Sequence, residues 1–224
     1  MPVQMIPRML GLILAAALGC IAAAFPAAPL AAADRPVTIV ALGDSLTAGF
    51  GLAAADAFPA KLQKALAAKG IAATIVNAGV SGDTASGGLA RLAWSVSDDA
   101  EGVIVELGAN DALRGVDPAV PRAALDAILR RLKERGIPVL LCGMLSPPNL
   151  GADYARAFNA IYPDLVKAYD PVFYPFFLAG VVTNRQFIQG DGLHPTAAGV
   201  DAIVANVLPK VEELIGRIRA KRRS

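Results

Sequence analysis

The stretch VTIVALGDSLTAG, residues 37–49, places an unbroken apolar run directly before a carboxylate, a hydroxyl and two glycines. A continuous apolar run predicts a strand covered on both faces, whereas an alternating run predicts a half-exposed one. Four further runs, the last of them weaker, lie at residues 73–76, 102–107, 137–142 and 171–176. Amphipathic segments with helical periodicity separate and follow the runs at residues 58–69, 88–96, 120–135, 154–169 and 195–219.

This alternation of strands and helices predicts an α/β fold, in which right-handed crossovers build a parallel sheet with helices on both faces. In such sheets ligands bind at the carboxyl ends of the strands. The first three strands are followed by GDS, NAG and GAND, at residues 43–45, 77–79 and 108–111. Because these segments combine glycines with polar groups, we expect them to meet at one edge of the sheet and to carry the chemistry.

Residues 1–33 have the pattern of a cleaved signal peptide. Arg8 precedes an apolar segment at residues 9–24, and three alanines, residues 31–33, come directly before Asp34. A basic residue, an apolar segment and an A-x-A site in this order are typical of secretory signals. We therefore expect export to the periplasm and a mature chain that starts near Asp34.

The rest of the chain, residues 34–224, predicts a single domain, because it contains no low-complexity linker, internal repeat or break in composition. We expect no stable membrane span in this mature form. Two alternatives for the amino terminus are an uncleaved membrane anchor and a lipoprotein anchored through Cys20. Once the signal is removed, Cys142 is the only cysteine, so an intrachain disulfide is excluded and a buried apolar role is expected.

Charge is distributed unevenly along the chain. Lys and Arg number 21 and Asp and Glu 19, but five of the basic residues lie within residues 217–224. The body of the predicted domain is therefore mildly acidic and lacks the basic face of a nucleic-acid-binding protein. For the basic tail we expect a solvated, frayed helix end rather than a contact with anionic lipid or nucleic acid.

Ser45 is a candidate nucleophile only if a base can take its proton. The chain has one histidine, His194, within the sequence DGLHP at residues 191–195. Asp191 lies three residues before it, so one turn can bring a carboxylate to Nδ1 of the imidazole while Nε2 faces the serine. The structural alternative is that His194 caps the next helix and Asp191 holds the turn. An otherwise unexplained serine at the same predicted edge favours the catalytic interpretation.

Ester cleavage also requires hydrogen-bond donors for the developing oxyanion, each worth about 3 kcal/mol. Three candidates follow successive strands: the N–H of Ser45, the N–H of Gly79 and the side-chain amide of Asn110. Each is an ordinary turn residue when taken alone. Their positions at successive strand ends favour a shared role.

Two other kinds of site fit the sequence less well. GFGLAA at residues 49–54 matches a loose dinucleotide-binding pattern, but it begins seven residues after the strand, and no acidic residue ends the second strand. Asp44, Asp111 and Asp191 offer carboxylates to a magnesium ion, as in a phosphatase, but no lysine or arginine stands beside them to meet a phosphate. The sequence also lacks G-x-S-x-G, the signature of the nucleophile elbow.

Four segments together resemble the blocks of the SGNH (GDSL-type) hydrolases, in the same order and over nearly the whole predicted domain. They are GDSL at residues 43–46, NAGVSGDT at 77–84, GAND at 108–111 and DGLH at 191–194. The similarity is greatest to the bacterial periplasmic arylesterases, acyl-CoA thioesterases and lysophospholipases. The resemblance implies a three-layer α/β/α, flavodoxin-like fold with a five-stranded parallel sheet.

The resemblance also implies roles for individual residues. Ser45, Asp191 and His194 would form a catalytic triad, and Ser45, Gly79 and Asn110 would supply the oxyanion hole. The implied activity is hydrolysis of small acyl esters or thioesters through an acyl-enzyme, with no metal and no cofactor. A carbohydrate-acetyl esterase on the same triad and an exported binding domain without activity are the alternatives.

The acyl pocket is expected after the fourth strand, where LSPPNLG at residues 145–151 is rich in proline. The predicted lid over the site consists of Pro147, Pro148, Asn149 and Leu150. Phe176 and Phe177 offer apolar surface nearby, and we expect at least one of them in the core. Trp94 lies at helical spacing from other apolar residues, which predicts packing rather than a substrate wall.

Overall fold

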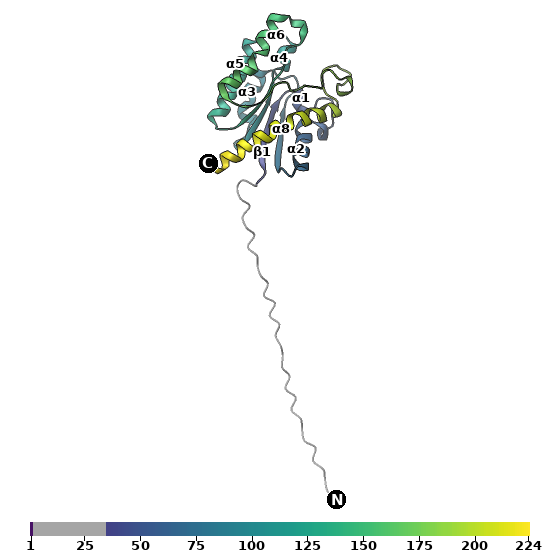
Figure 1. Cartoon of the computed structure of the whole chain (residues 1–224), viewed down its shortest axis with the longest axis vertical. Helices are drawn as coiled ribbons and strands as arrows, with labels where there is room; N and C mark the ends of the chain where they lie inside the picture. The colour runs from purple at the N-terminus through teal and green to yellow at the C-terminus, as the bar shows by residue number, and fades with distance from the viewer. Residues whose placement is uncertain (2–34) are drawn as a thin grey trace.

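A computed structural model describes residues 35–224, together with Met1 (Figure 1). The predicted cleavage site and Cys20 fall within residues 2–34 and therefore lie outside the described residues. In the described part of the chain, no helix is both long enough and apolar enough to cross a membrane.

Five parallel strands form one sheet. They are β1 (Val37–Gly43), β2 (Ala73–Gly79), β3 (Gly102–Glu106), β4 (Val139–Cys142) and β5 (Val172–Tyr174). Their order across the sheet is β2-β1-β3-β4-β5, and every adjacent pair is parallel. The prediction of an α/β fold with a five-stranded parallel sheet is therefore confirmed.

Helices cover the sheet in two layers. The larger ones are α2 (Phe58–Ala68), α3 (Ala85–Ser95), α5 (Ala119–Glu134), α7 (Ile161–Tyr169) and α8 (Ala197–Arg223). The shorter ones are α1 (Ser45–Ala48), α4 (Ala109–Leu113), α6 (Ala152–Asn159) and the 3-10 turns η1 (Ala54–Asp56), η2 (Pro148–Leu150) and η3 (Arg185–Phe187). Helix α2 packs against α8, whereas α3 and α7 pack against α5, and Figure 1 shows the two groups on opposite sides of the sheet.

The helix predicted at residues 154–169 is wrong as a single element, because the chain divides at Ala160 into α6 and α7. Pro163 accounts for the break. A proline inside a helix has no N–H to donate and its ring clashes with the carbonyl four residues earlier, here that of Asn159. The break leaves Asn159 at the end of α6, where its side-chain Oδ1 accepts a hydrogen bond from the N–H of Ser146 (2.8 Å).

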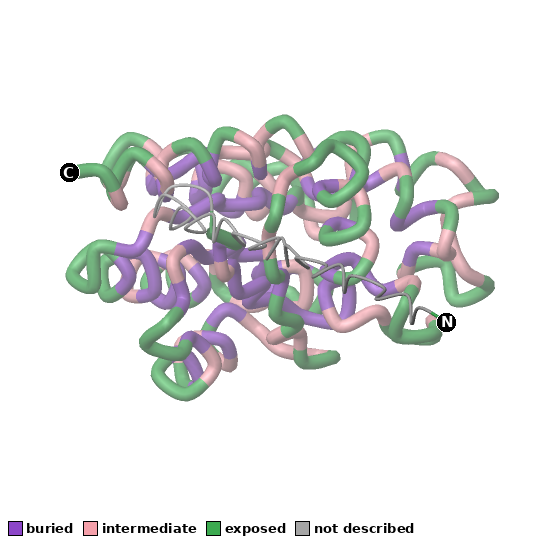
Figure 2. Tube along the Cα trace, turned by 90° about the horizontal axis from the view of Figure 1, so that it is seen from below, coloured by how far each residue is buried: buried purple, intermediate pink, exposed green. Residues whose placement is uncertain are grey.

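Strand β2 is an exception to the prediction that the strands are covered on both faces. It lies at the edge of the sheet, where Ile75 is its one buried residue and Val76 is 39% exposed. The N–H of Ile75 donates to Oε1 of Gln63, so a side chain caps part of the free edge. The central strands β1, β3 and β4 are almost entirely buried, and Figure 2 shows that buried segments gather in the interior of the domain. Cys142, at the end of β4, is a buried free cysteine, as predicted.

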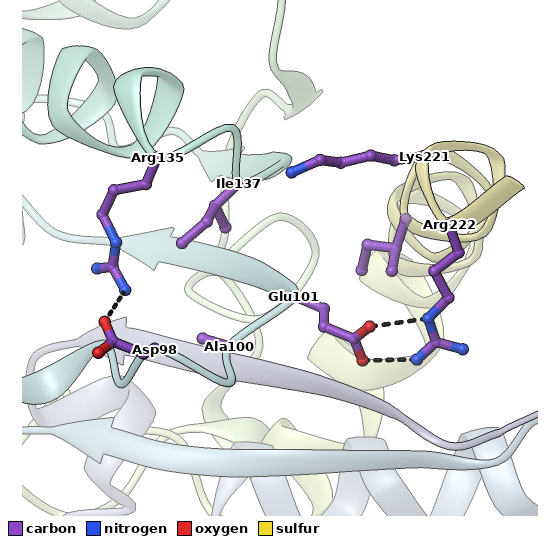
Figure 3. Close-up of a pocket in the computed structure, with 8 residues that line it drawn as sticks. Asp98, Ala100, Glu101, Arg135, Ile137, Lys221 and Arg222 are labelled. Atoms are coloured by element: carbon purple, nitrogen blue, oxygen red, sulfur yellow. Dashed lines mark hydrogen bonds and ion pairs between the residues drawn. The ribbon is translucent and has the colours of Figure 1, made fainter. Parts of the chain in front are cut away.

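The prediction of a frayed basic tail is wrong, because α8 continues to Arg223 and its last turns dock against the domain. The side chain of Arg222 is 8% exposed and forms a two-pronged ion pair with Glu101, at 2.8 and 2.5 Å (Figure 3). It also donates to the carbonyls of Arg35 and Pro36, at 2.9 Å each. These acceptors lie at the amino-terminal ends of β1 and β3, so the tail closes the bottom of the sheet.

Candidate active site

The register of the sheet brings three strand ends together. Gly43, at the end of β1, pairs with Gly79 of β2 on one side and with Glu106 of β3 on the other. Asp44 follows as the N-cap of α1, and Ser45 is the first residue of that helix. The carboxyl ends of the three strands therefore meet at one edge, as expected.

Ser45, His194 and Asp191 form a chain of two hydrogen bonds. Oγ of Ser45 lies 2.8 Å from Nε2 of His194, and Nδ1 of His194 lies 2.6 Å from Oδ2 of Asp191. The structural alternative, a histidine that only caps α8, does not hold, because Thr196 provides that cap and accepts from the N–H of Gly199. The structure thus joins Ser45 to the Asp191–His194 pair, although Ser45 and His194 are 149 positions apart in the sequence.

The loop at residues 191–194 is a tight turn organised by its aspartate. Oδ1 of Asp191 accepts from the backbone N–H groups of Leu193 (2.9 Å) and His194 (3.0 Å). These two backbone donors, with the His194 side chain, lower the pKa of Asp191 to about 2. Gly192 has a φ of +77°, which lets the chain turn within three residues. The carboxylate therefore stays ionised and holds the imidazole in one orientation.

Phe50 is a neighbour of the histidine that no sequence pattern indicated. Its ring lies 4.5 Å from the His194 ring, centroid to centroid, with the planes tilted by 35°. The side chain is half exposed, so it covers one face of the imidazole at the surface of the site. Gln189 holds the Phe50 loop by donating from Nε2 to the carbonyl of Phe50 (2.8 Å).

Asn110 lies in α4 with its amide directed at the segments that follow β1 and β2. Its Nδ2 donates to Oδ2 of Asp44 (3.1 Å) and to the carbonyl of Asp83 (3.0 Å). Gly108, just before α4, has a φ of +115°, and a Cβ there would lie 2.2 Å from the Tyr162 hydroxyl. The sharp turn that aims Asn110 therefore requires glycine.

Gly79 lies at the expected strand end, but its N–H is directed elsewhere. It donates to Oδ1 of Asn77 (3.0 Å). A Cβ on Gly79 would lie 2.3 Å from the backbone nitrogen of Ala48, so the glycine is needed for close packing of β2 against α1. This geometry gives Gly79 a packing role and does not direct its N–H to Ser45.

Gly82, three residues later, differs from Gly79 because its N–H is not engaged within residues 35–224. Its φ is +86°, and none of the hydrogen bonds within the described chain uses its N–H. The next residue, Asp83, is the one whose carbonyl accepts from Asn110. Both glycines belong to the same block, and the sequence signal that separates them is that Gly82 lies beyond the strand, in the turn before α3.

Several buried carboxyls lie beneath the site. Asp44, Glu106 and Asp111 are each at most 1% exposed, and burial raises the pKa of all three, that of Asp44 to about 6. Oε2 of Glu106 accepts from the Thr47 hydroxyl (2.7 Å) and Oδ2 of Asp111 from the N–H of Ala85 (2.8 Å). Within residues 35–224, no group of three His, Cys, Asp or Glu side chains is placed to hold a metal, so the three-aspartate magnesium site is not formed.

A cavity of about 430 Å³ opens beside Ser45, His194 and Asn110. Its walls are largely apolar and come from the segments after β1, β3, β4 and β5; they include Leu46, Leu113, Met144, Leu145, Phe176, Leu178, Val182 and Leu193. Of the predicted lid, Pro147 and Pro148 line the cavity, whereas Asn149 and Leu150, which complete the η2 turn, are not part of its walls. A second cavity, of about 470 Å³, lies at the opposite end of the sheet around Arg222 and Glu101, away from this chemistry.

The aromatic residues near the predicted pocket differ in whether they line the cavity or belong to the core. Phe176 lines the cavity, whereas Phe177 is fully buried and packs edge-on against Phe58, at 5.1 Å. The expectation that one of the two belongs to the core is confirmed. Trp94, predicted to be buried packing, is 73% exposed, because it lies on the outer face of α3.

Comparison with known proteins identifies a family and solved structures that the chain resembles. A model of the GDSL-like Lipase/Acylhydrolase family matches residues 41–202. The chain is 38% identical over 179 residues to Esterase TesA of Pseudomonas aeruginosa, covering 80% of this chain and 89% of that protein. It is 43% identical over 166 residues to Thioesterase 1/protease 1/lysophospholipase L1 of Escherichia coli K12, covering 74% and 77%. The crystal structure of the SGNH-hydrolase family esterase AlinE4 superposes with a TM-score of 0.68 at 48% identity, covering 80% of this chain and 96% of that one.

Proposed function

The chain belongs to the GDSL-like lipase/acylhydrolase family, and from this premise we propose that it hydrolyses carboxylic esters and thioesters with Ser45 as the nucleophile. The observation that carries the proposal is the continuous hydrogen-bonded chain from Oγ of Ser45 through His194 to Asp191. A serine, a base and an orienting carboxylate in this arrangement are the parts that acyl transfer needs.

The reaction proceeds in two steps. Oγ of Ser45 attacks the acyl carbon while its proton passes to Nε2 of His194; the histidine then gives that proton to the departing alcohol or thiol, leaving an acyl-serine. Water attacks the acyl-serine with His194 again taking the proton, the acid is released, and the proton returns to Ser45. Asp191 stays ionised throughout and stabilises the imidazolium that forms in each step.

The oxyanion is received by donors on three segments. The N–H of Ser45 lies at the start of α1, where a helix leaves its first N–H groups without an internal partner. The side-chain amide of Asn110 is the second donor, once the oxyanion replaces one of its two present acceptors, Oδ2 of Asp44 or the carbonyl of Asp83. For the third, the unengaged N–H of Gly82 is favoured over the N–H of Gly79, which Asn77 occupies.

The apolar cavity favours an acyl chain over a sugar as the group held beside Ser45. A volume of about 430 Å³ with mainly aliphatic and aromatic walls suits a flexible hydrocarbon chain. In a series of p-nitrophenyl esters we expect kcat/KM to rise from acetate towards medium-length chains. Faster cleavage of acetylated xylan than of any such ester would instead indicate a carbohydrate-acetyl esterase.

The test of the proposal is substitution of the nucleophile. Ser45→Ala should reduce p-nitrophenyl butyrate hydrolysis to near background and abolish covalent labelling by a fluorophosphonate, because no other group replaces the attacking oxygen. The matched control is Ser97→Ala, at an exposed serine between α3 and β3 and outside the four blocks, which should retain both signals. Retained hydrolysis in folded Ser45→Ala would refute the assignment. A wild-type protein that neither hydrolyses esters nor takes the label would indicate a binding domain.

We also propose that residues 1–33 are a signal peptide removed on export, leaving residues 34–224 as a single periplasmic domain. The support is the pattern of Arg8, the apolar segment and the alanines before Asp34. Amino-terminal sequencing of the periplasmic protein should begin at or near Asp34. A lipid-modified Cys20 at the amino terminus would show the lipoprotein alternative instead.

A further inference from the structure

Asp44 uses its two carboxylate oxygens for different purposes. Oδ1 accepts from the N–H of Leu46 (2.9 Å), which is an ordinary N-cap for α1. Oδ2 accepts from Nδ2 of Asn110 (3.1 Å), the side chain proposed as an oxyanion donor. The whole side chain is buried. The cap accounts for one oxygen and leaves the second contact to be explained.

Capping α1 does not require a carboxylate at position 44. Serine, threonine and asparagine cap helices about as well and carry no charge. A charge at this position is costly, because burial dominates its environment and raises the pKa of Asp44. The buried guanidinium of Arg91 does not offset this cost, since it donates to Asp83 and to the carbonyls of Gly43 and Ala78. An acid here is therefore unexplained by helix capping.

The contact with Asn110 does use what distinguishes a carboxylate from other caps. An ionised carboxylate only accepts hydrogen bonds, whereas an amide or a hydroxyl can also donate. The Asn110 amide can be turned by half a rotation to exchange its oxygen and nitrogen. Its two partners, Oδ2 of Asp44 and the carbonyl of Asp83, are both acceptors in the structure, so they admit only the orientation that presents nitrogen.

We propose that Asp44 is a positioning residue for the oxyanion hole, because its carboxylate keeps the amide nitrogen of Asn110, rather than the amide oxygen, at the position between Asp44 and Asp83, where a developing oxyanion would take over one of the two N–H groups. The three residues line the same cavity. Glu106 supports the arrangement from below, since its Oε2 accepts from the Thr47 hydroxyl (2.7 Å) and from the N–H of Asp44 (3.4 Å). The inference rests on the proposed function, because it assigns Asp44 a part in the same reaction.

A double-mutant cycle between Asp44 and Asn110 tests the inference on the purified protein with p-nitrophenyl butyrate. In Asp44→Asn, an asparagine that keeps its oxygen on the N–H of Leu46 turns its NH2 group toward the NH2 group of Asn110, so the Asn110 amide must turn or move away. Each of Asp44→Asn and Asn110→Ala should lower kcat by about 100-fold or more, with KM changed by less than about threefold. In the double variant kcat should be no lower than in Asn110→Ala alone, because Asp44 acts through a donor that is already absent.

Two further variants make the cycle decisive. Asp44→Ser keeps a cap for the N–H of Leu46 but does not reach Asn110, so it should show the same kcat loss if Asp44→Asn fails to fold. Asp111→Asn changes a buried carboxyl that bonds the N–H of Ala85 instead, and its effect, whatever its size, should multiply with that of Asn110→Ala. If the effects of Asp44→Asn and Asn110→Ala also multiply, or if Asp44→Asn leaves kcat unchanged, the positioning role is overturned. The proposed function is refuted by different results, namely full ester hydrolysis by Ser45→Ala or no ester hydrolysis by the wild type.

Discussion

Removal of the Arg222 side chain should destabilise the domain far more than removal of any other charge near the carboxyl terminus. The guanidinium bonds both oxygens of Glu101 and the carbonyls of Arg35 and Pro36, and it is 8% exposed. Removing one partner of a buried ion pair costs about 3–5 kcal/mol when the other charge is left unpaired; here Glu101 keeps an exposed ion pair with Arg35 (3.1 Å). Glu101 is 18% exposed and keeps some contact with water, so we expect the lower end, about 3 kcal/mol, for Arg222→Ala.

Urea and thermal unfolding of Arg222→Ala and Arg223→Ala measure this difference. The two residues are adjacent and carry the same charge, but Arg223 is exposed, so its removal should change the free energy of unfolding by less than about 0.5 kcal/mol. For a domain of this size, a loss of about 3 kcal/mol corresponds to a fall in Tm of about 6–12 °C. Ester hydrolysis at 25 °C should be unchanged in both variants, because the tail lies at the opposite end of the sheet from Ser45.

The pH dependence of the stability difference between wild type and Arg222→Ala shows whether the ion pair with Glu101 causes it. The hydrogen bonds from Arg222 lower the pKa of Glu101, so the pair stabilises the domain at pH values above the ordinary range of a glutamate. This contribution is lost as the pH falls and Glu101 takes up a proton. The gap between wild type and Arg222→Ala should therefore narrow from pH 7 to pH 3. Equal stabilities of Arg222→Ala and Arg223→Ala at pH 7 would refute the docked tail and restore the frayed one.

Two further predictions concern the active-site edge. Burial raises the pKa of Asp44 from 3.8 to about 6. Ionisation of Asp44 therefore destabilises the fold as the pH rises through this interval, by about 3 kcal/mol. Urea unfolding at pH 4 to 7 should show a smaller fall in the free energy of unfolding for Asp44→Asn than for wild type. Gly79→Ala forces a Cβ to within 2.3 Å of the Ala48 nitrogen and should cost about 1–3 kcal/mol, with reduced ester hydrolysis. Gly190→Ala, at a position with open space, is its control and should be close to neutral.

The sheet could be predicted from the sequence because its central strands are covered on both faces. Strands β1, β3 and β4 are buried along their length and read as unbroken apolar runs. The runs also locate the strand ends, and therefore the edge at which Ser45 and Asn110 meet. Strand β2 lies at the margin of the sheet, where burial on one face is enough, so its apolar run overstated how far it is covered.

Features that depend on tertiary contacts could not be predicted in this way. Arg222 lies in a basic run that is typical of solvated helix ends, and only the approach of Glu101, 121 residues earlier, makes it structural. The position of Phe50 over His194 likewise joins two loops with no shared pattern. The bond that engages the Gly79 N–H depends on the rotamer of Asn77, which composition and spacing do not determine.

The stability and the activity of Asp44→Asn should change in opposite directions, and this contrast separates the two explanations for the aspartate. If Asp44 served only to cap α1, an asparagine would supply the same bond to the N–H of Leu46 without a buried charge, and the variant would be at least as stable and as active. If the carboxylate instead orients Asn110, the variant gains stability near pH 7 through loss of the charge but loses kcat. At a functional site, a residue is expected to be kept for activity even where an uncharged substitute would make the fold more stable.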